Sequence, residues 1–268
     1  METKENKVPA ILQELREAYK TSGSSKYINT LLYGGMGSGK TTLLRTAVKP
    51  VLIHSFDPGG AKVLTDEIDR GEIIVDTSFE KEDAKKPSVY MAWDKAYERL
   101  KNADVFSQIG TYVIDSLTLF SDAMMNEILR RNGRAGTTPQ LQDYMVQITT
   151  TKQYVASITS LPCHTILIGH IEADKDELTG RMMTSLMITG KLKDKIPILI
   201  DEVYMTCTKE SSKGVEYMLL TKNTGLYKAR TRIGRNGIFE TYEEPNLKSL
   251  LKRGGYDAED KPLLLKQE

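Results

Sequence analysis

Eight residues near the start of the chain constrain its fold more than any other segment. Residues 34–41 read Gly-Gly-Met-Gly-Ser-Gly-Lys-Thr and match the pattern G-x-x-x-x-G-K-[ST]. An apolar run, Tyr27 to Tyr33, precedes them, and helix-forming residues begin at Thr41. Closely spaced glycines let consecutive backbone N–H groups point at one anion, and the dipole of the following helix adds to the attraction. The segment therefore predicts a strand, a phosphate-binding loop and a helix, in that order.

The same loop predicts the ligand. Loops of this kind bind nucleoside triphosphates, with the lysine, here Lys40, on the β- and γ-phosphates and the next hydroxyl, Thr41, on Mg²⁺. We therefore expect ATP and Mg²⁺ as cofactors. The alternative is a plain glycine-rich turn, which the flanking strand and helix disfavour. Ser38 and Thr42 receive no separate role. The expected nucleotide-binding residues are Gly34, Gly35, Met36, Gly37, Ser38, Gly39, Lys40, Thr41 and Thr42.

A second anchor for Mg²⁺ is expected at the end of another buried strand. The run Thr111 to Ile114 is β-branched, typical of strands buried in parallel sheets, and ends at Asp115. Asp115 is the expected second ligand of the metal, and its alternative role is to cap the following helix. Ser116 comes next, where many ATPases carry the carboxylate that activates water. The base must therefore come from elsewhere or be absent.

Two further side chains at strand ends are candidates for chemistry at the γ-phosphate. Asp57 follows the strand Val51 to Ser55 and opens an Asp-Pro-Gly-Gly turn, so it is the candidate general base. Alternatively, its carboxylate bonds only its own turn. His170 follows the strand Thr165 to Gly169 and would contact the γ-phosphate or the attacking water. The alternative for His170 is a structural histidine.

Two cations near the C-terminus are candidates for a role across a subunit interface. Lys228 and Arg230 lie two apart on a predicted strand, Tyr227 to Ile233, so both side chains project from one face. In a monomer they would form an exposed polar face. In an oligomer they could reach the γ-phosphate of a neighbouring subunit.

The order of the predicted elements indicates an α/β fold with a mostly parallel central sheet flanked by helices. Strands and helices alternate up to residue 170, whereas later strands are separated only by turn residues and are expected to pair antiparallel. A helix over Ala10 to Lys20 is expected to pack on the sheet edge, and residues 171–194 are expected to form a long mobile loop. The expected parts are an N-terminal helix and linker (1–26), one ATPase domain (27–255) and a tail (256–268).

Composition excludes several classes of protein. The 268 residues carry 37 basic and 36 acidic side chains, so the net charge of +1 gives no global attraction for nucleic acid. Any such binding must be local, at basic groups such as 130–134 or 191–195, although most groups of this kind are solvated surface. No run approaches the roughly 20 apolar residues of a spanning helix, and the two cysteines have no metal-site spacing. We expect a cytoplasmic protein.

With these motifs in this order, the sequence resembles the phage nucleotide-binding ATPases of the RecA-like class, which are small AAA-domain proteins associated with recombination or single-strand annealing. The resemblance covers roughly residues 28–250. Its two departures are Asp57, where many relatives carry Glu, and the lack of aromatic residues in the suspected DNA loops. The segments that carry it are Leu32 to Thr42, Phe56 to Gly60, Val113 to Ser116, Ile168 to His170 and Tyr227 to Arg230.

The resemblance implies an ATP-driven ring or filament of identical subunits, with Lys228 and Arg230 completing the neighbour's site. It also implies single-stranded DNA binding by Asn132 to Thr138 and Ile171 to Asp194, with His170 coupling the γ-phosphate to DNA. A phage single-strand-binding protein is a further candidate partner, and the compartment would be the cytoplasm of the bacterial host. Two rival functions stay open: a motor or loader ATPase acting on a protein, and a nucleotide-binding assembly module that does not hydrolyse ATP.

Overall fold

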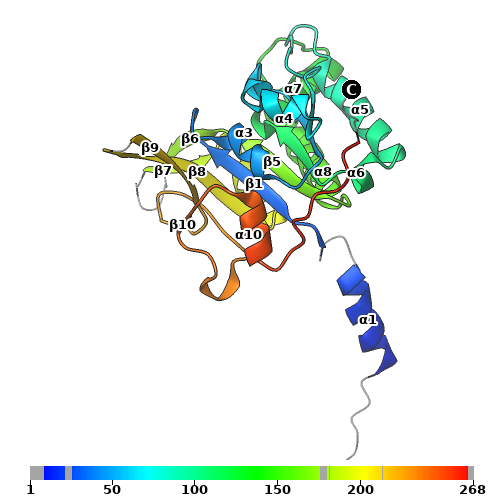
Figure 1. The fold of residues 1–268 in the computed structure, drawn as a ribbon. Helices are drawn as coiled ribbons and strands as arrows, with labels where there is room; N and C mark the ends of the chain where they lie inside the picture. The colour runs from blue at the N-terminus through cyan, green and yellow to red at the C-terminus, as the bar shows by residue number, and fades with distance from the viewer. Residues whose placement is uncertain (1–8, 22–25, 176–179, 181, 213, 265–268) are drawn as a thin grey trace, which may run out of the picture.

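A computed structural model describes residues 9–21, 26–175, 180, 182–212 and 214–264, and all structural statements refer to these residues. Its main sheet has eight strands in the order β10-β9-β8-β1-β5-β4-β2-β3 (Figure 1). Six neighbouring strands, from β8 to β3, are parallel, while β9 and β10 extend the sheet antiparallel. The strands are β1 (Asn29–Gly34), β2 (Val51–Ser55), β3 (Ile73–Asp76), β4 (Thr111–Asp115), β5 (His164–Gly169), β8 (Glu202–Ser211), β9 (Gly214–Leu220) and β10 (Tyr242–Glu243).

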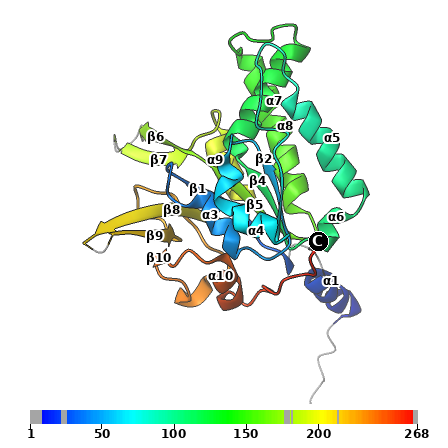
Figure 2. The ribbon, with the colours of Figure 1, turned by 45° about the horizontal axis from the view of Figure 1, so that its top comes forward.

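Helices cover both faces of this sheet, as expected for an α/β fold (Figure 2). One face packs an aromatic-rich core against α5, α7 and α8, centred on Trp93, Tyr97 and Phe120. The other face packs aliphatic side chains against the helix after the phosphate loop and against α10. The helices are α1 (Ala10–Thr21), α3 (Lys40–Leu43), α4 (Thr65–Asp69), α5 (Val89–Asn102), α6 (Val105–Gln108), α7 (Leu117–Arg131), α8 (Leu141–Thr159), α9 (Leu192–Leu199) and α10 (Leu247–Arg253), with 3₁₀ turns at Leu44–Thr46, Gly60–Leu64 and Arg235–Gly237.

The expected α/β architecture is confirmed, and several elements have the bounds that their sequence predicts. Helix α7 begins after Ser116, whose hydroxyl accepts a hydrogen bond from the backbone N–H of Leu119 and so caps the helix. The antiparallel C-terminal strands are present as β9, which pairs with β8, and β10, which pairs with β9.

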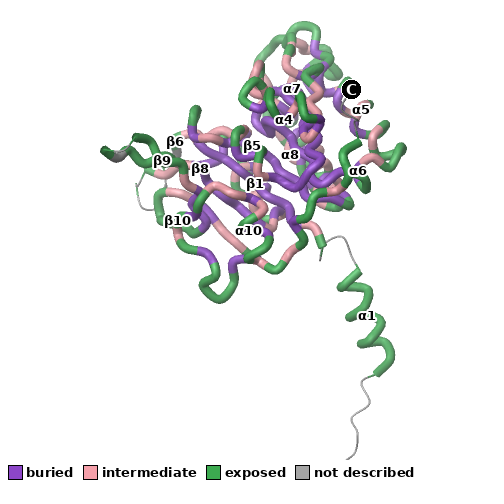
Figure 3. The backbone as a smooth tube through the Cα atoms, viewed as in Figure 1, coloured by how far each residue is buried: buried purple, intermediate pink, exposed green. Residues whose placement is uncertain are grey.

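The N-terminal helix does not pack on the sheet edge, so that expectation is wrong. Helix α1 has no buried residue and stands away from the body of the domain (Figure 3). Its apolar stripe remains exposed at Ile11, Leu12, Leu15 and Tyr19. The four residues of the expected linker that follow α1, 22–25, lie outside the described residues, as do 1–8.

Two expectations about the second half of the chain are also wrong. Instead of one long mobile loop, the segment after His170 forms an antiparallel hairpin, β6 (Ile171–Lys175) and β7 (Met182–Leu186), followed by α9. Residues 176–179 and 181 lie outside the described residues. The strand expected over 227–233 is reduced to two isolated bridges, Thr184 to Tyr227 and Val203 to Arg230. The β8–β9 ladder occupies Met205–Ser211, so only the first residues of β8 are open on that side, and the segment pairs there through Val203 and Arg230 alone.

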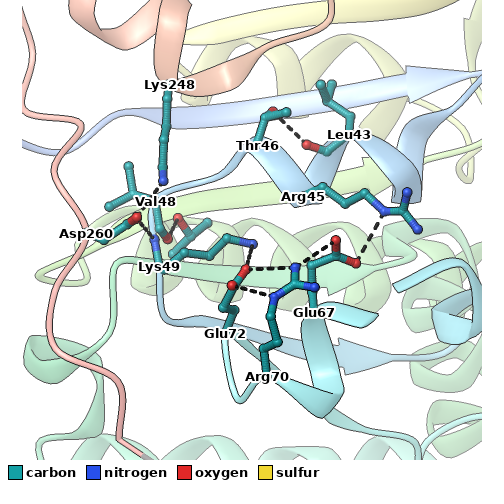
Figure 4. Close-up of polar contacts among 11 residues, drawn as sticks. Leu43, Arg45, Thr46, Val48, Lys49, Glu67, Arg70, Glu72, Lys248 and Asp260 are labelled. Atoms are coloured by element: carbon teal, nitrogen blue, oxygen red, sulfur yellow. Dashed lines mark hydrogen bonds and ion pairs between the residues drawn. The ribbon is translucent and has the colours of Figure 1, made fainter. Parts of the chain in front are cut away.

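The segment after α10 folds back across the end of the sheet where its parallel strands begin. The Asp260 carboxylate accepts from the backbone N–H of Lys49 at 2.6 Å, and the backbone N–H of Lys261 donates to the carbonyl of Lys49 at 2.9 Å. Figure 4 shows the contact between Asp260 and Lys49 beside a chain of alternating charges that continues to Arg45. Arg45 lies in the 3₁₀ turn after α3, so this network links that turn to Glu72, just before β3, and to the segment after α10.

Candidate active site

The predicted phosphate loop lies between β1 and α3, and its glycines have the conformations that such a loop needs. Gly37 and Gly39 have φ values of 74° and 88°, a region that L side chains rarely adopt. Gly34 lies so close to β8 that an added Cβ would be 2.1 Å from the Thr206 hydroxyl oxygen. Ser38 is fixed from the same side, because its hydroxyl lies 2.6 Å from that of Thr206. Strand β8 therefore packs against the phosphate loop through Thr206 and holds its backbone in place.

Lys40 extends across the loop it terminates. Its ammonium donates to the carbonyls of Gly34 at 3.0 Å and Gly35 at 2.8 Å. Burial lowers the pKa of Lys40, while the charges of Asp115 and Asp57 oppose that shift. The side chain is therefore held inside the curve of the loop, where a phosphate would be bound.

Thr41 and Asp115 meet as the motif predicts. The Thr41 hydroxyl donates to Asp115 Oδ2 at 2.9 Å, and the registers of β2, β4 and β5 place Ser55, Asp115 and Ile168 side by side. Burial, together with the charge of Asp57, raises the pKa of Asp115 to about 6. These two oxygen donors suit Mg²⁺, which takes few protein ligands and completes its shell with phosphate oxygens and water. No group of three His, Cys, Asp or Glu side chains in the described residues could hold a metal.

Asp57 and His170, predicted separately from two strand ends, are in direct contact. Asp57 Oδ2 lies 2.7 Å from Nε2 of His170, and Asp57 Oδ1 accepts from the Ser116 hydroxyl at 2.6 Å. Burial would raise the pKa of Asp57, but the hydrogen bonds from His170 and Ser116 hold it below its ordinary value. Asp57 is therefore a charged carboxylate at neutral pH, with both oxygens oriented by neighbours.

One cavity of about 650 Å³ joins these groups, a size suited to a small-molecule ligand. The phosphate loop lines it together with Asp57, Asp115 and His170. Thr46, Tyr217, Met218 and Pro245 also line it. The nucleotide-binding residues predicted from sequence that line this cavity are Met36, Gly37, Ser38, Gly39, Lys40, Thr41 and Thr42.

Lys228 and Arg230 do not line this cavity. Lys228 pairs with Asp194 at 3.0 Å on the surface. Arg230 donates to the carbonyls of Pro197, at 2.7 Å, and Ile200, at the end of α9. Both side chains therefore project toward α9 and the residue that follows it. They point the same way, as predicted, although the strand is absent.

The arginines of the basic group 130–134, at the start of the first suspected DNA segment, are engaged within the chain. Arg130 and Arg131 each contact Glu127 at 2.7 Å, and Arg134 donates to both oxygens of the buried Asp143. This turn lies at the far end of α7, apart from the β6–β7 hairpin in both views (Figures 1 and 2).

Sequence reasoning missed several residues that shape the site. Ser116 was noted only for the carboxylate that it replaces, although a serine after a strand-end Asp could have suggested a hydrogen-bonding partner. Thr206 and Tyr217 come from β8 and β9 and reach the loop only through the sheet order, so no local signal marks them. Glu80 holds the turn after β2 by accepting from the Ser55 hydroxyl at 2.7 Å and the N–H of Gly59 at 3.1 Å.

The phosphate loop lies between β1 and α3, and Asp115, at the end of β4, accepts a hydrogen bond from Thr41 at the end of that loop. Together with the sheet order, this arrangement defines a P-loop ATPase of RecA-like fold. The family model for the AAA domain matches residues 26–233, and the chain belongs to this family. No protein with a curated record matches the sequence significantly.

Several solved structures are similar to this chain. One is a KaiC-like protein from the hyperthermophilic archaeon Pyrococcus horikoshii OT3, with 14% identity over 77% of this chain and 84% of that one, at a TM-score of 0.41. Another is the flagellar accessory protein FlaH from Methanocaldococcus jannaschii, with 9% identity over 81% and 84%, at 0.43. An ATPase from the type III secretion system of pathogenic bacteria has 12% identity over 78% of this chain and 58% of its own, at 0.49.

In the described part of the chain, no helix combines the length and the apolar character needed to cross a membrane.

Proposed function

We propose that Asp57 is the general base of MgATP hydrolysis and that His170 and Ser116 position it. The observation that carries this proposal is the pair of short contacts on the Asp57 carboxylate, beside Lys40 and Asp115 in one cavity. A base must be charged, oriented and close to the γ-phosphate, and Asp57 meets the first two requirements. The third follows if the triphosphate lies along the loop in the manner of other P-loop enzymes.

The other residues divide the remaining tasks. Lys40 and the backbone N–H groups of the loop would bind the phosphates, while Thr41 and Asp115 would hold the metal ion. Bound Mg²⁺ supplies positive charge that offsets the charge of the phosphate oxygens. Asp57 would accept one proton from the attacking water, while His170 keeps the receiving oxygen aimed along the cavity.

We further propose that the active form is an oligomer and that Lys228 serves the neighbouring subunit. Its partner Asp194 is an exposed residue, and a surface ion pair of this kind is worth little. Lys228 can therefore leave it for a phosphate at small cost. Arg230 is bound to two backbone carbonyls, so the same role for Arg230 requires movement at the end of α9.

Single-stranded DNA is the partner that we propose from the resemblance to phage recombination ATPases, with a phage single-strand-binding protein as a second partner. Because the arginines at 130–134 are ion-paired within the chain, we assign DNA contact to the segment 171–194, where Lys191 is the residue just before α9. A protein-stimulated loader and a non-hydrolysing module are the rival functions.

The test is phosphate release from MgATP by wild type and Asp57→Asn, with and without single-stranded DNA. Removing the base should lower turnover about 100-fold, because general-base catalysis contributes at least that much. The Kd for ATP should stay within about twofold, since the substituted amide has the same shape as the carboxylate. Unchanged turnover would eliminate Asp57 as base. ATP binding without phosphate release in wild type would favour the non-hydrolysing module.

DNA and assembly are tested in the same assay. DNA should raise wild-type turnover, and an equal rate with and without DNA, together with no mobility shift, would remove the DNA proposal. Lys40→Ala and Lys228→Ala should partly restore each other's activity when mixed, because each provides what the other lacks. No recovery on mixing, although both variants form oligomers, would overturn the role in trans.

A further inference from the structure

The cavity has two chemically different ends. At one end lie the charged groups Lys40, Asp57, Asp115 and the ring of His170. At the other, the lining is formed by Tyr217 and Met218 from β9, by Pro245 and by Arg45 and Thr46 of the 3₁₀ turn after α3. A nucleoside triphosphate has the same polarity, since its γ-phosphate and its base lie at opposite ends of the molecule.

The phosphate loop fixes the direction in which such a ligand would lie. Lys40 and Thr41 act on the terminal phosphates, beside Asp57 and Asp115. The base must therefore leave the loop away from Asp57, toward the end lined by Tyr217 and Pro245. The strand order agrees with this direction: β5, β4 and β2, which lead to His170, Asp115 and Asp57, lie on one side of β1, whereas β9, which carries Tyr217, lies on the other.

Tyr217 is well placed at that end. A Cβ added to Gly39 would lie 3.1 Å from a ring carbon of Tyr217, so the ring packs against the phosphate loop itself. Strand β8 positions it, since Thr208 and Tyr217 are partners in the β8–β9 ladder. Tyr217 nevertheless remains 49% exposed. An exposed ring beside a phosphate site can take a second planar group.

Polar side chains at this end are already engaged. The Thr46 hydroxyl donates to the Leu43 carbonyl at 2.8 Å and accepts from the N–H of Leu247 at 3.0 Å. Arg45 binds the Val63 carbonyl and lies 3.3 Å from the Glu67 carboxylate, in the network of Figure 4. The Thr46 hydroxyl and the Arg45 guanidinium are therefore both bound within the chain and are not directed to the edge of a base.

We propose that Tyr217, beside Pro245, is the platform on which the nucleobase stacks, and that it recognises the flat face of a base rather than its hydrogen-bonding edge. Stacking is tolerant of base identity because every base has a π-face. Strong discrimination requires buried groups that hydrogen-bond the ligand. The site therefore binds purine nucleoside triphosphates with similar affinity. This inference rests on the proposed function of the same cavity.

The test is binding of MgATP, MgGTP and magnesium tripolyphosphate by wild type, Tyr217→Ala and Tyr217→Phe. Wild type should bind ATP and GTP within about tenfold of each other, since stacking discriminates weakly. Tyr217→Ala should weaken both nucleotides by about tenfold or more, the usual effect of removing a stacking aromatic ring. Its affinity for tripolyphosphate, which has no base, should not change. Tyr217→Phe keeps the ring and should bind like wild type.

Each other outcome contradicts a defined part of the proposal. Equal ATP affinity in Tyr217→Ala and wild type removes the platform, and so does a Tyr217→Phe variant as weak as Tyr217→Ala, because the hydroxyl would then be the contact. Equal loss of ATP and tripolyphosphate means that Tyr217 only supports the loop. A preference for one purine above about 100-fold overturns recognition by stacking alone. Failure of wild type to bind any of the three ligands would instead contradict the phosphate site itself.

Discussion

The phosphate loop and the turn after α7 are both polar regions rich in charge, yet their charges are held in opposite ways. In the loop, Lys40 contacts only backbone carbonyls, which a phosphate can replace. In the turn, Arg134 is bound to both oxygens of a fully buried carboxylate, Asp143. A basic residue is available to a ligand only if its present partner can be given up at small cost. The contrast separates a binding group from a structural group of the same sign.

The largest effect is expected when one basic residue in each region is replaced by alanine. Lys40→Ala should lower ATP turnover by about 1000-fold, because a preorganised charge on the transferred phosphate is lost. Its Tm should stay near that of wild type, since Lys40 contacts only backbone carbonyls. Arg134→Ala should do the reverse, with a Tm lower by several degrees and unchanged ATP affinity, because the buried Asp143 loses the cation that binds both its oxygens and keeps only Asn132 and the N–H of Gln140.

Thermal unfolding and ATP titration of both variants test this contrast. A normal Tm in Arg134→Ala would show that the turn does not hold its charges as described. Arg131→Ala is the matched control, because its guanidinium shares Glu127 with Arg130 and should be the milder loss.

A smaller effect, on the pH dependence of stability, is expected from the buried histidines. Burial lowers the pKa of His54 to about 4, although the charge of Asp76 opposes the shift. Between that value and its ordinary pKa of 6.5, the unfolded chain binds a proton that the folded chain refuses. This contribution to the free energy of unfolding is therefore complete above pH 6.5 and is lost as pH falls toward 4, by up to about 3 kcal/mol.

Urea unfolding at several pH values measures that slope. His54→Gln removes the titrating group and should flatten the dependence, whatever its effect at pH 7. His164, whose pKa burial also lowers to about 4, accounts for a second part of the same slope. An unchanged slope in His54→Gln would show that His54 does not titrate on unfolding.

The smallest effect is expected in α1, whose side chains are all exposed. Leu15→Ser should change the Tm of the monomeric chain by less than about 1 °C, because exposed positions contribute little to stability. Leu117→Ser, at a buried position of α7, is the matched substitution and should destabilise the protein strongly. A large loss in Leu15→Ser would mean that α1 packs on the domain after all.

Local patterns were enough to predict the phosphate loop and the aspartates at strand ends, because each depends on residues adjacent in sequence. The same holds for α7, which starts after Ser116 and ends at Arg131 as its sequence predicts. The partnership of Ser38 with Thr206 could not be predicted, since it exists only because β8 lies beside β1. Their sequence separation, 168 residues, leaves no local trace.

Two errors have a physical explanation. The start of the segment after His170 alternates apolar and charged residues, a pattern typical of an exposed hairpin, but its high charge favoured a loop. The segment 227–233 has the composition of a strand, yet β9 occupies β8 from Met205 onward and leaves only the start of that strand for pairing with Arg230. Propensity describes what a segment can do, and the neighbouring strands decide whether it does so.

The position of β1 between β5 and β8 also sets the time at which the nucleotide site can form. Asn29, at the start of β1, bonds Thr165 and Asp201, which lie 136 and 172 residues further along the chain. Contacts that close such long stretches of chain slow folding, because the entropy of closure is lost before the contact forms. The loop carried by β1 is thus flanked by its final neighbours only when β5 and β8 have paired with β1, although it is among the first segments to be synthesised. Nucleotide can stabilise the completed domain by mass action, but it cannot guide the early steps of folding.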